Sequence, residues 1–400
     1  MMQAENIINW LASPEGIRLA NLASAMPDDS LLQLTQLRQR TSIDRANAIL
    51  DQLNLRRRAR YRFPSANSMY FTASGLNQAT VPAIARYHGS LLRDCQLVLD
   101  AGCGIGADLR EIAAFCPVIA VDTSVDTLAC ARLNTRGYAA HGVRFVCADL
   151  TTLSMEALTR GGVDGLFCDP GRRQEAAGIT HRVRSAELSS PPLSWLLSAV
   201  ERFPQILFKL SPAIPDDELR QLGGLVQFVS FGGQCREALS LPKRSPTDYT
   251  AVRVADDGSS EELTVIHGSH VGAGQTGEWL YEPDPAAIRA HLVDTLAVLS
   301  QTHRLVDGLA YLTGDALVKN SWLTPYRVIE PVPCDVRYLR AWQKRSDRRI
   351  SVVKTRGATP TPEEMIAKLR DPAVHGAKQA VLFLARDHTG VTAVLCEPAS

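Results

Sequence analysis

The sequence lacks the features that mark zinc ribbons, disulfide frameworks and membrane proteins. Its nine cysteines are scattered, odd in number and never spaced as Cys-x-x-Cys, which argues against the first two classes. No apolar stretch approaches the length of a membrane span. The first ten residues lack the basic start and long apolar run of a signal peptide. We therefore expect reduced thiols in a cytoplasmic protein, with no bound metal and no membrane contact.

The sequence also lacks an excess of either charge. It contains 43 Lys and Arg residues against 42 Asp and Glu residues, so any basic surface must be local. Its length of 400 residues exceeds what one hydrophobic core usually organises, and two or three domains are expected on this ground. The apolar content of 45% is sufficient to fill those cores.

The pattern of apolar residues predicts helices first and then a parallel sheet. Residues 1 to about 62 carry leucines at helical spacing, and from Gln96 short aliphatic runs alternate with amphipathic segments, as in βαβ units. The predicted strands are 96–100, 117–121, 143–147, 164–168, 205–210 and 225–231, and the predicted helices are 107–115, 124–136, 185–202 and 216–222. A hairpin through Gly232-Gly233 adds a strand at 234–241. The fold class is thus α/β, mostly parallel with one antiparallel edge pair.

The last third of the chain has its own pattern. A turn signal lies near 254–260, and helical periodicity returns after Pro283. Beyond about residue 330 we predict strands near 349–354, 380–385 and 391–396. These flank a helix at 362–370 that Thr361-Pro362-Glu363-Glu364 introduces.

The strongest functional signal is a buried strand that runs into a glycine loop and a helix, from Val98 to Leu109. The backbone needs Gly102, Gly104 and Gly106 there because it must turn sharply and approach a ligand where a Cβ would collide. The same glycines also fit the dinucleotide-binding pattern. Asp100 favours S-adenosylmethionine (SAM) over NAD, because a carboxylate suits an ammonium group and sits poorly beside a pyrophosphate.

Two further acids follow strands of the predicted sheet. Asp122 ends the second strand, where a carboxylate commonly holds a ribose diol. Asp149 follows the third strand, where it can meet an adenine amino group, although a solvent-facing strand end explains it as well. The predicted cofactor site is therefore Asp100, Gly102, Gly104, Gly106, Asp122 and Asp149.

With this loop, the sequence resembles the class I SAM-dependent methyltransferases. Further segments are similar to the bacterial methyltransferases that carry a C-terminal THUMP-like domain: 70–80, 169–173, 209–212, 281–284 and 354–357. The resemblance implies a Rossmann-like methyltransferase sheet with an N-terminal helical segment and a C-terminal α+β region, ferredoxin-like and then THUMP-like. The implied parts are a helical domain at 1–80, a SAM-binding methyltransferase domain at 81–255, a small ferredoxin-like linking domain at 256–327 and a THUMP-like domain at 328–400. THUMP domains in other proteins bind RNA.

The predicted acceptor side is Asp169-Pro170-Gly171-Arg172-Arg173, at the carboxyl end of the fourth strand, where ligands bind in open α/β sheets. Asp169, Pro170, Arg172 and Arg173 are the predicted catalytic residues. The two arginines either present planar donors to a phosphate or carboxylate, or pair with nearby glutamates and shape the loop. Because Gly171 and Arg172 replace the second proline and the aromatic of amino-methylating enzymes, N6-adenine chemistry is disfavoured.

Three neighbouring side chains have weaker claims to a role in catalysis. Cys168 precedes Asp169 and is expected to be a packed core thiol rather than a nucleophile. Lys209 ends the fifth strand and either approaches the same cleft or extends its ammonium to solvent. His181 could serve as a base near neutral pH, but a single loop histidine is more often a bystander.

Two local basic runs suggest an RNA partner. One contains Arg337, Arg340, Lys344, Arg345, Arg348 and Arg349, followed by Lys354 and Arg356, and the other contains Arg56, Arg57 and Arg58. Interleaved aromatic residues could add stacking to the charge.

SAM-dependent methyl transfer to RNA is the function predicted from these features. A small-molecule methyltransferase and a noncatalytic RNA-binding protein that keeps SAM as a ligand are the alternatives.

Overall fold

The computed structural model describes residues 6–171, 173–176, 179–182, 189–245, 248–357, 361–370, 378–388 and 390–399. The chain forms two compact units. Unit 1 contains Met1–Phe231, Arg236–Asp248 and Arg253–Glu261, and unit 2 contains Gly232–Cys235, Tyr249–Val252 and Glu262–Ser400.

Unit 1 begins with the predicted helices. These are α1 (Ile7–Leu11), α2 (Pro14–Ser24), α3 (Ser30–Arg38) and α4 (Ile43–Ala59), followed by the 3-10 helix η1 (Ala66–Ser68), α5 (Ala73–Gln78) and α6 (Pro82–Leu91). The side-chain oxygens of Asn6, Ser13, Asp29 and Ser42 accept hydrogen bonds from backbone amides in the first turns of α1 to α4. These caps satisfy amide groups that a helix start otherwise leaves without a partner.

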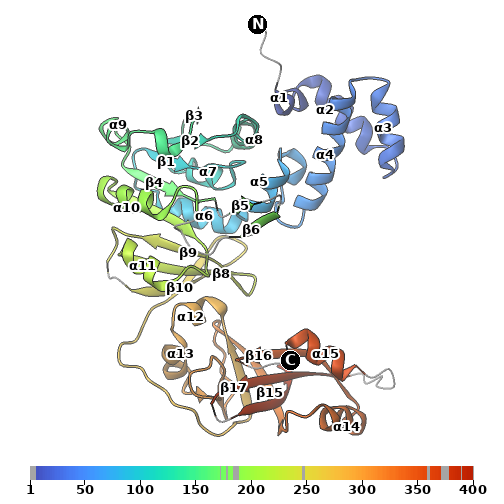
Figure 1. The fold of residues 1–400 in the computed structure, drawn as a ribbon, viewed down its shortest axis with the longest axis vertical. Coiled ribbons are helices and arrows are strands. Elements are labelled where there is room, and N and C mark those ends of the chain that lie inside the picture. The colour runs from blue at the N-terminus through green and yellow to red at the C-terminus, as the bar shows by residue number, and fades with distance from the viewer. Residues whose placement is uncertain are drawn as a thin grey trace. The chain divides into compact units, whose positions relative to one another are not determined.

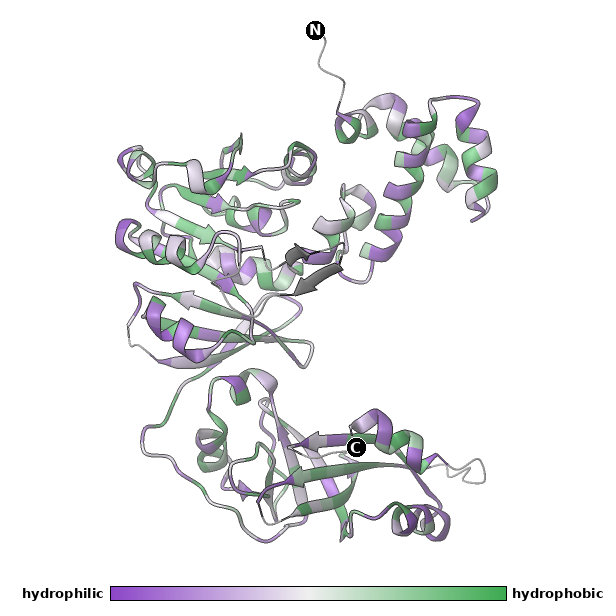
Figure 2. Cartoon of the chain, viewed as in Figure 1, coloured by the Kyte–Doolittle hydropathy of each residue, from purple (hydrophilic) through white to green (hydrophobic). Residues whose placement is uncertain are grey.

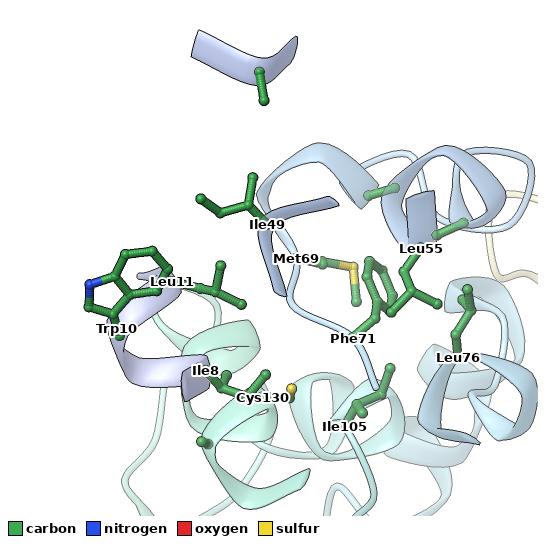
Figure 3. Packing of buried hydrophobic residues seen from close by; sticks show 14 of the residues in the cluster. Ile8, Trp10, Leu11, Ile49, Leu55, Met69, Phe71, Leu76, Ile105 and Cys130 are labelled. Atoms are coloured by element: carbon green, nitrogen blue, oxygen red, sulfur yellow. The ribbon is translucent and has the colours of Figure 1, made fainter. Parts of the chain in front are cut away.

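The helical segment shares a hydrophobic core with the rest of unit 1. Phe71 packs in one buried cluster with Met69 and Leu55, and the same cluster contains Ile105 and Cys130 from the methyltransferase-like part. Figure 3 shows these side chains pointing toward one another from the different elements. The helices therefore pack directly on the glycine loop and on the helix that follows the second strand.

The sheet of unit 1 has the order β11-β10-β8-β9-β7-β4-β1-β2-β3. Its strands are β1 (Val98–Ala101), β2 (Val118–Asp122), β3 (Val143–Cys147), β4 (Gly165–Cys168), β7 (Gln205–Leu210), β8 (Leu225–Phe231), β9 (Gln234–Leu241), β10 (Tyr249–Val254) and β11 (Ser260–Leu263). The central pairs β1 with β2, β1 with β4 and β4 with β7 are parallel, as predicted. The predicted hairpin is present, but β9 pairs antiparallel with β7 inside the sheet, and β10 and β11 form the edge instead.

Helices flank this sheet in two rows (Figure 1). One row contains α6, α7 (Ala107–Ile112) and α8 (Val125–Thr135), and the other contains α9 (Met155–Arg160), α10 (Leu193–Arg202) and α11 (Asp216–Leu222). The helix predicted from residue 185 begins only at Leu193, after Pro191-Pro192, because a proline disfavours helical backbone in the residue before it. A short hairpin of β5 (Arg173–Ala176) and β6 (Ile179–Arg182) precedes it, in a segment where we expected a loop.

Unit 2 contains a second sheet with the order β13-β14-β12-β15-β18-β17-β16. Its strands are β12 (Trp279–Pro283), β13 (His303–Arg304), β14 (Leu312–Gly314), β15 (Leu323–Val332), β16 (Arg348–Arg356), β17 (Lys378–Arg386) and β18 (Val391–Pro398), and its helices are α12 (Pro285–Arg289), α13 (Val293–Ser300), α14 (Val336–Ser346) and α15 (Pro362–Leu369). The three predicted strands and the capped helix α15 are present, and Thr361 with Glu364 forms a capping box. The expected domain boundary between residues 327 and 328 lies within β15. This strand pairs with β12, which precedes the boundary in the sequence, and with β18, which follows it.

Two kinds of feature are absent from the described part of the chain. No helix there is long and apolar enough to cross a membrane. The described residues also contain no cluster of histidine, cysteine and acidic side chains that could hold a metal ion. Figure 2 shows hydrophobic residues along the strands of both sheets, whereas α14 is mostly hydrophilic.

Candidate cofactor and acceptor site

The glycine loop between β1 and α7 has the backbone shape that its sequence requires. Gly102, Gly104 and Gly106 have φ values of 89°, 54° and 85°, a region that residues with a Cβ rarely adopt. A Cβ on Gly106 would also lie 3.0 Å from the Cα of Ala131 in α8. No heavy atom would lie within 4 Å of a Cβ on Gly104, so open space adjoins this side of the loop.

Asp100 is the best evidence that this open space receives a cation. It lies in β1, is 0% exposed, and neither of its carboxyl oxygens has a hydrogen-bond partner in the structure. Burial, reinforced by the nearby Asp108 and Asp122, raises the pKa of Asp100 well above its ordinary value. A buried acid without donors is costly, and an ammonium group beside the loop would remove that cost. The residues present therefore fit the amino-acid end of SAM.

Asp122 lies at the end of β2, and its carboxylate contacts the backbone of the glycine loop. Its two carboxylate oxygens accept hydrogen bonds from the amide of Gly104 at 3.2 Å and from the amide of Ser124 at 2.9 Å. The side chain is half-buried, so it faces the loop while part of it stays accessible. These contacts give Asp122 a structural role that the sequence did not reveal, and its ribose contact stays a prediction.

Asp149 is less clearly part of the site. It follows β3 and begins the 3-10 helix η2 (Leu150–Thr152), where its Oδ1 accepts from the amide of Thr151 at 2.8 Å and from the hydroxyl of Thr151 at 2.7 Å. Its side chain is exposed, and these hydrogen bonds lower its pKa. The adenine contact of Asp149 stays a prediction.

The predicted acceptor corner adjoins the cofactor loop. β4 pairs with β1 so that Cys168 is opposite Ala101, and a Cβ on Gly102 would lie 3.8 Å from the backbone oxygen of Asp169. Gly171 then bridges to Ser190 through two backbone hydrogen bonds of 2.8 and 3.0 Å. The sheet therefore brings Asp169 and the glycine loop together, as the sequence predicts.

The two predicted arginines of this corner cannot be placed in the same way. Arg172 lies outside the described residues. Arg173 begins β5, which pairs with β6, and His181 lies in β6 opposite Gln174. The roles of Arg172 and Arg173 in ligand binding or in loop pairing stay predictions.

A cavity of about 710 Å³ opens beside Asp169. Its lining comes from four places in unit 1: Arg62 after α4, the segment from the end of α5 to the start of α6, the acceptor corner, and the end of β7 with the start of β9. This volume lies within the range of pockets that bind small molecules or single nucleotides. Arg62, Asn77, Lys209, Arg236 and Glu237 make much of the wall polar.

Lys209 and Asp169 form an ion pair at the inner end of this cavity. Lys209 is 6% exposed and donates to Asp169, and it also donates to the hydroxyl of Thr80 at 2.9 Å. Burial alone would lower the pKa of Lys209, but the carboxylates of Asp169 and Asp108 outweigh burial and raise it. Of the two interpretations of Lys209, the structure supports the one that places it in the cleft.

A buried histidine connects this ion pair to a second acid of the cavity. His88 in α6 is 0% exposed; its Nδ1 lies 2.8 Å from Asp108, and its Nε2 lies 2.5 Å from Glu237. Burial would lower the pKa of His88, but Glu237 and Asp108 raise it to about 9. His88 is therefore a cation between two carboxylates at neutral pH. Burial would raise the pKa of Asp108, but Lys209 and His88 lower it to about 2.

Sequence reasoning missed this charge network of His88, Asp108 and Glu237. No local signal marks these residues, because Asp108 shares α7 with Arg110 and Glu111, and Glu237 follows Arg236 in β9. The partners are also far apart along the chain, since His88 and Glu237 are separated by 149 residues. Cys168, by contrast, behaves as predicted: it is 0% exposed, and burial raises its pKa well above the ordinary value, so it stays a thiol.

Comparisons with known proteins agree with this geometry. Residues 98–169 match the family described as "Methyltransferase domain", and residues 6–59 match a domain of unknown function (DUF8688). Two strains of Mycobacterium tuberculosis have a protein named as an uncharacterized S-adenosylmethionine-dependent methyltransferase. It is 29% identical over 373 residues, which cover 89% of this chain and 98% of the relative.

A solved crystal structure shares the fold of the whole chain. A crystal structure of a candidate methyltransferase from Porphyromonas gingivalis W83 aligns over 100% of both chains with a TM-score of 0.79 and 16% identity. The strand-loop-helix geometry, the buried Asp100 without a donor and the matched methyltransferase domain lead to one conclusion. This chain is a SAM-dependent methyltransferase with a class I, Rossmann-like cofactor domain, and SAM is its cofactor.

Proposed function

We propose that this methyltransferase transfers the methyl group to an RNA nucleotide that enters the cavity beside Asp169. The observation that carries the proposal is the position of this cavity. It is lined by Asp169, Pro170 and Gly171, and Asp169 also adjoins the cofactor loop at Gly102. A nucleotide in this space would meet a methyl donor bound at the loop without any rearrangement of the sheet.

Asp169 and Pro170 are the proposed catalytic residues of the described chain, with Arg172 and Arg173 as further candidates. When bound, SAM supplies an electrophilic methyl group on a sulfonium. Pro170 fixes the turn after β4, and the ion pair with Lys209 fixes the carboxylate of Asp169 at the cavity wall. A fixed carboxylate can accept a hydrogen bond from an N–H or O–H of the acceptor and orient it, and orientation is a large part of catalysis in such transfers.

The cofactor roles are assigned in the same proposal. Asp100 would receive the ammonium, the backbone at Gly102, Gly104 and Gly106 would surround the amino-acid end, and Asp122 would hold the ribose. Asp149 would meet the adenine. The orphaned carboxyl of Asp100 and the partly accessible carboxylate of Asp122 support the first and third of these roles.

The RNA part of the proposal draws on the basic surface of unit 2. Arg337, Arg340, Lys344 and Arg345 are exposed on α14, and Arg349 is exposed at the start of β16. Three other members of the predicted run are engaged within unit 2. Arg348 donates to Glu397 at 2.5 Å, Lys354 pairs with Glu282, and the guanidinium of Arg356 lies over the ring of Tyr311. The proposed RNA surface is therefore the exposed subset, in a region that we propose is THUMP-like.

The second predicted basic run has a mainly structural role. Arg56 donates to the backbone oxygen of Met69 at 2.9 Å, Arg57 pairs with Asp28, and Arg58 donates to Asn77 at 3.3 Å. The contacts of Arg56 and Arg58 fasten α4 to the segment that leads into the cavity wall, and that of Arg57 fastens it to the loop between α2 and α3. RNA binding by these three arginines stays a prediction with less support than that by α14.

The test is incubation of the full chain with tritiated SAM and total RNA from cells that lack the protein, followed by nucleoside analysis. The small-molecule fraction of the same cells is assayed in parallel, with Asp169→Ala as the control enzyme. We expect label in one modified nucleoside with the wild type and none with the variant. Label in the small-molecule fraction alone would reject RNA as the substrate, and SAM binding without any transfer would reject catalysis.

A further inference from the structure

Two arginines of the cavity lining have no acidic partner among the described residues. Among the charged groups of its lining, Arg62, Lys209 and Arg236 are cationic, and Asp169 and Glu237 are acidic. The acids are already paired, Asp169 with Lys209 and Glu237 with His88. Within the described part of the chain, neither Arg62 nor Arg236 has an ion pair.

Arg62 is held in place by the backbone of the cavity wall. Its guanidinium donates to the carbonyl oxygen of Leu76 at 2.8 Å and to that of Ala79, and it lies 5.6 Å from the ring centroid of Phe63. These contacts use carbonyl oxygens and a ring face, so they leave the positive charge without an anionic partner. The side chain is half-buried, which limits screening of this charge by water.

Arg236 stands close enough to Arg62 for the two charges to repel each other. Burial, together with the charge of Arg236, lowers the pKa of Arg62. Arg236 is exposed and donates from its Nε to the carbonyl oxygen of Phe231 at 3.3 Å. Two like charges on one cavity wall cost free energy in the empty site, and an anion between them would recover it.

We propose that Arg62 and Arg236 form an anion subsite that binds a phosphate group of the methyl acceptor. This inference rests on the proposed function and deepens it, because it names the chemistry that fixes the acceptor beside Asp169. Guanidinium groups suit a phosphate, because their remaining N–H groups can donate charge-assisted hydrogen bonds to its oxygens. The phosphate can belong to an RNA backbone or to a free phosphorylated molecule, and the two sources share this chemistry.

The first experiment measures binding of inorganic phosphate to the full chain by calorimetry at constant ionic strength. The variants are Arg236→Gln, which removes the charge from an exposed side chain, Arg236→Lys, which keeps it, and Arg202→Gln as a matched control. Arg202 is an exposed arginine at the end of α10 and does not line the cavity. We expect the Kd for phosphate to rise about tenfold in Arg236→Gln, the effect of one charge-assisted hydrogen bond.

We expect a smaller rise in Arg236→Lys and no change in Arg202→Gln. Equal phosphate affinity of the wild type and Arg236→Gln would overturn the subsite, as would no phosphate binding by the wild type at millimolar concentrations. Neither result depends on methyl transfer, so neither tests the proposed function.

The second experiment identifies the source of the phosphate by measuring transfer from tritiated SAM to RNA and to small phosphorylated molecules. A higher KM for RNA in Arg236→Gln, with the Kd for SAM unchanged, would support a phosphate of the RNA backbone. Label in small phosphorylated molecules alone would keep the subsite and reject RNA. An unchanged KM for RNA in Arg236→Gln would reject the subsite and leave RNA methylation standing.

Discussion

Replacing His88 with glutamine tests whether unit 1 depends on a charge buried within it. His88 is 0% exposed and lies between Asp108 at 2.8 Å and Glu237 at 2.5 Å. Glutamine keeps hydrogen-bonding atoms but removes the positive charge between two buried carboxylates, of which Asp108 keeps Lys209 at 4.0 Å. Removing one partner of a buried ion pair typically costs about 3–5 kcal/mol, so His88→Gln should reduce the stability of unit 1 by this amount.

The effect should depend on pH with a definite sign. The pKa of His88 is raised from 6.5 to about 9, so its contribution to stability is fully present below pH 6.5 and is lost as pH rises through about 9. At 1.36 kcal/mol per pKa unit, the wild type should lose roughly 2 kcal/mol of this contribution between pH 7 and pH 9.5. The difference between the wild type and His88→Gln should shrink accordingly.

Amide hydrogen exchange of β1 and β4, followed by mass spectrometry, measures the opening of unit 1 separately from unit 2. His141→Gln is the matched control, because His141 is an exposed histidine in the same unit. The reasoning is refuted if His88→Gln changes the free energy of opening by less than about 1 kcal/mol, well below the expected cost of a broken buried pair. It is equally refuted if the difference from the wild type is the same at pH 7 and pH 9.5.

Three further predictions concern the cofactor, the acceptor and RNA. Asp122→Ala should weaken SAM binding by about 1.5–3 kcal/mol in calorimetry, the range for hydrogen bonds to charged groups, and an unchanged Kd would remove Asp122 from the site. Asp169→Ala should abolish methyl transfer in the tritium assay while the Kd for SAM stays within a few-fold, and wild-type turnover would disprove its role. Replacing Arg345 and Arg349 with alanine should flatten the slope of log affinity against log salt by up to about 1.4 units in filter binding to single-stranded RNA, because each phosphate contact contributes about 0.7. Identical slopes would identify α14 as an ordinary solvated surface.

The local parts of the fold could be predicted from the sequence, because they depend on residues close together in the chain. Strands β3, β7 and β8 lie where the apolar runs predict them, and the three loop glycines have the positive φ values that their spacing requires. The cofactor loop and the acceptor corner meet because parallel strands end at the same edge of a sheet. Both parts of the site follow from pattern and topology.

The contacts across long stretches of sequence could not be predicted in this way. The pairing of His88 with Glu237 joins a helix before β1 to a strand near the end of the sheet, and no local pattern encodes it. The position of β9 inside the sheet is a similar case, since its hairpin predicts pairing with β8 but not with β7. Arg62 follows the basic run Arg56 to Arg58 without a motif of its own, and its place in the cavity depends on how α5 packs.

The N-terminal helices explain why the cavity has a defined wall next to the cofactor loop. Gln52 in α4 accepts from the amide of Phe71 at 2.9 Å and donates to its carbonyl oxygen at 3.0 Å. Asn134 in α8 holds Tyr70 in the same two ways and also donates to the carbonyl oxygen of Ile105 in the glycine loop at 2.9 Å.

One buried amide in each of two helices thus fixes the segment that leads into the cavity wall. At the end of this segment, Thr80 donates to Asp108 at 2.6 Å and accepts from Lys209, the partner of Asp169. The same short stretch is therefore anchored to the cofactor loop at one end and to the acceptor corner at the other. A site held in this way by buried side chains on helices and strands can keep donor and acceptor aligned, which is what methyl transfer requires of the protein.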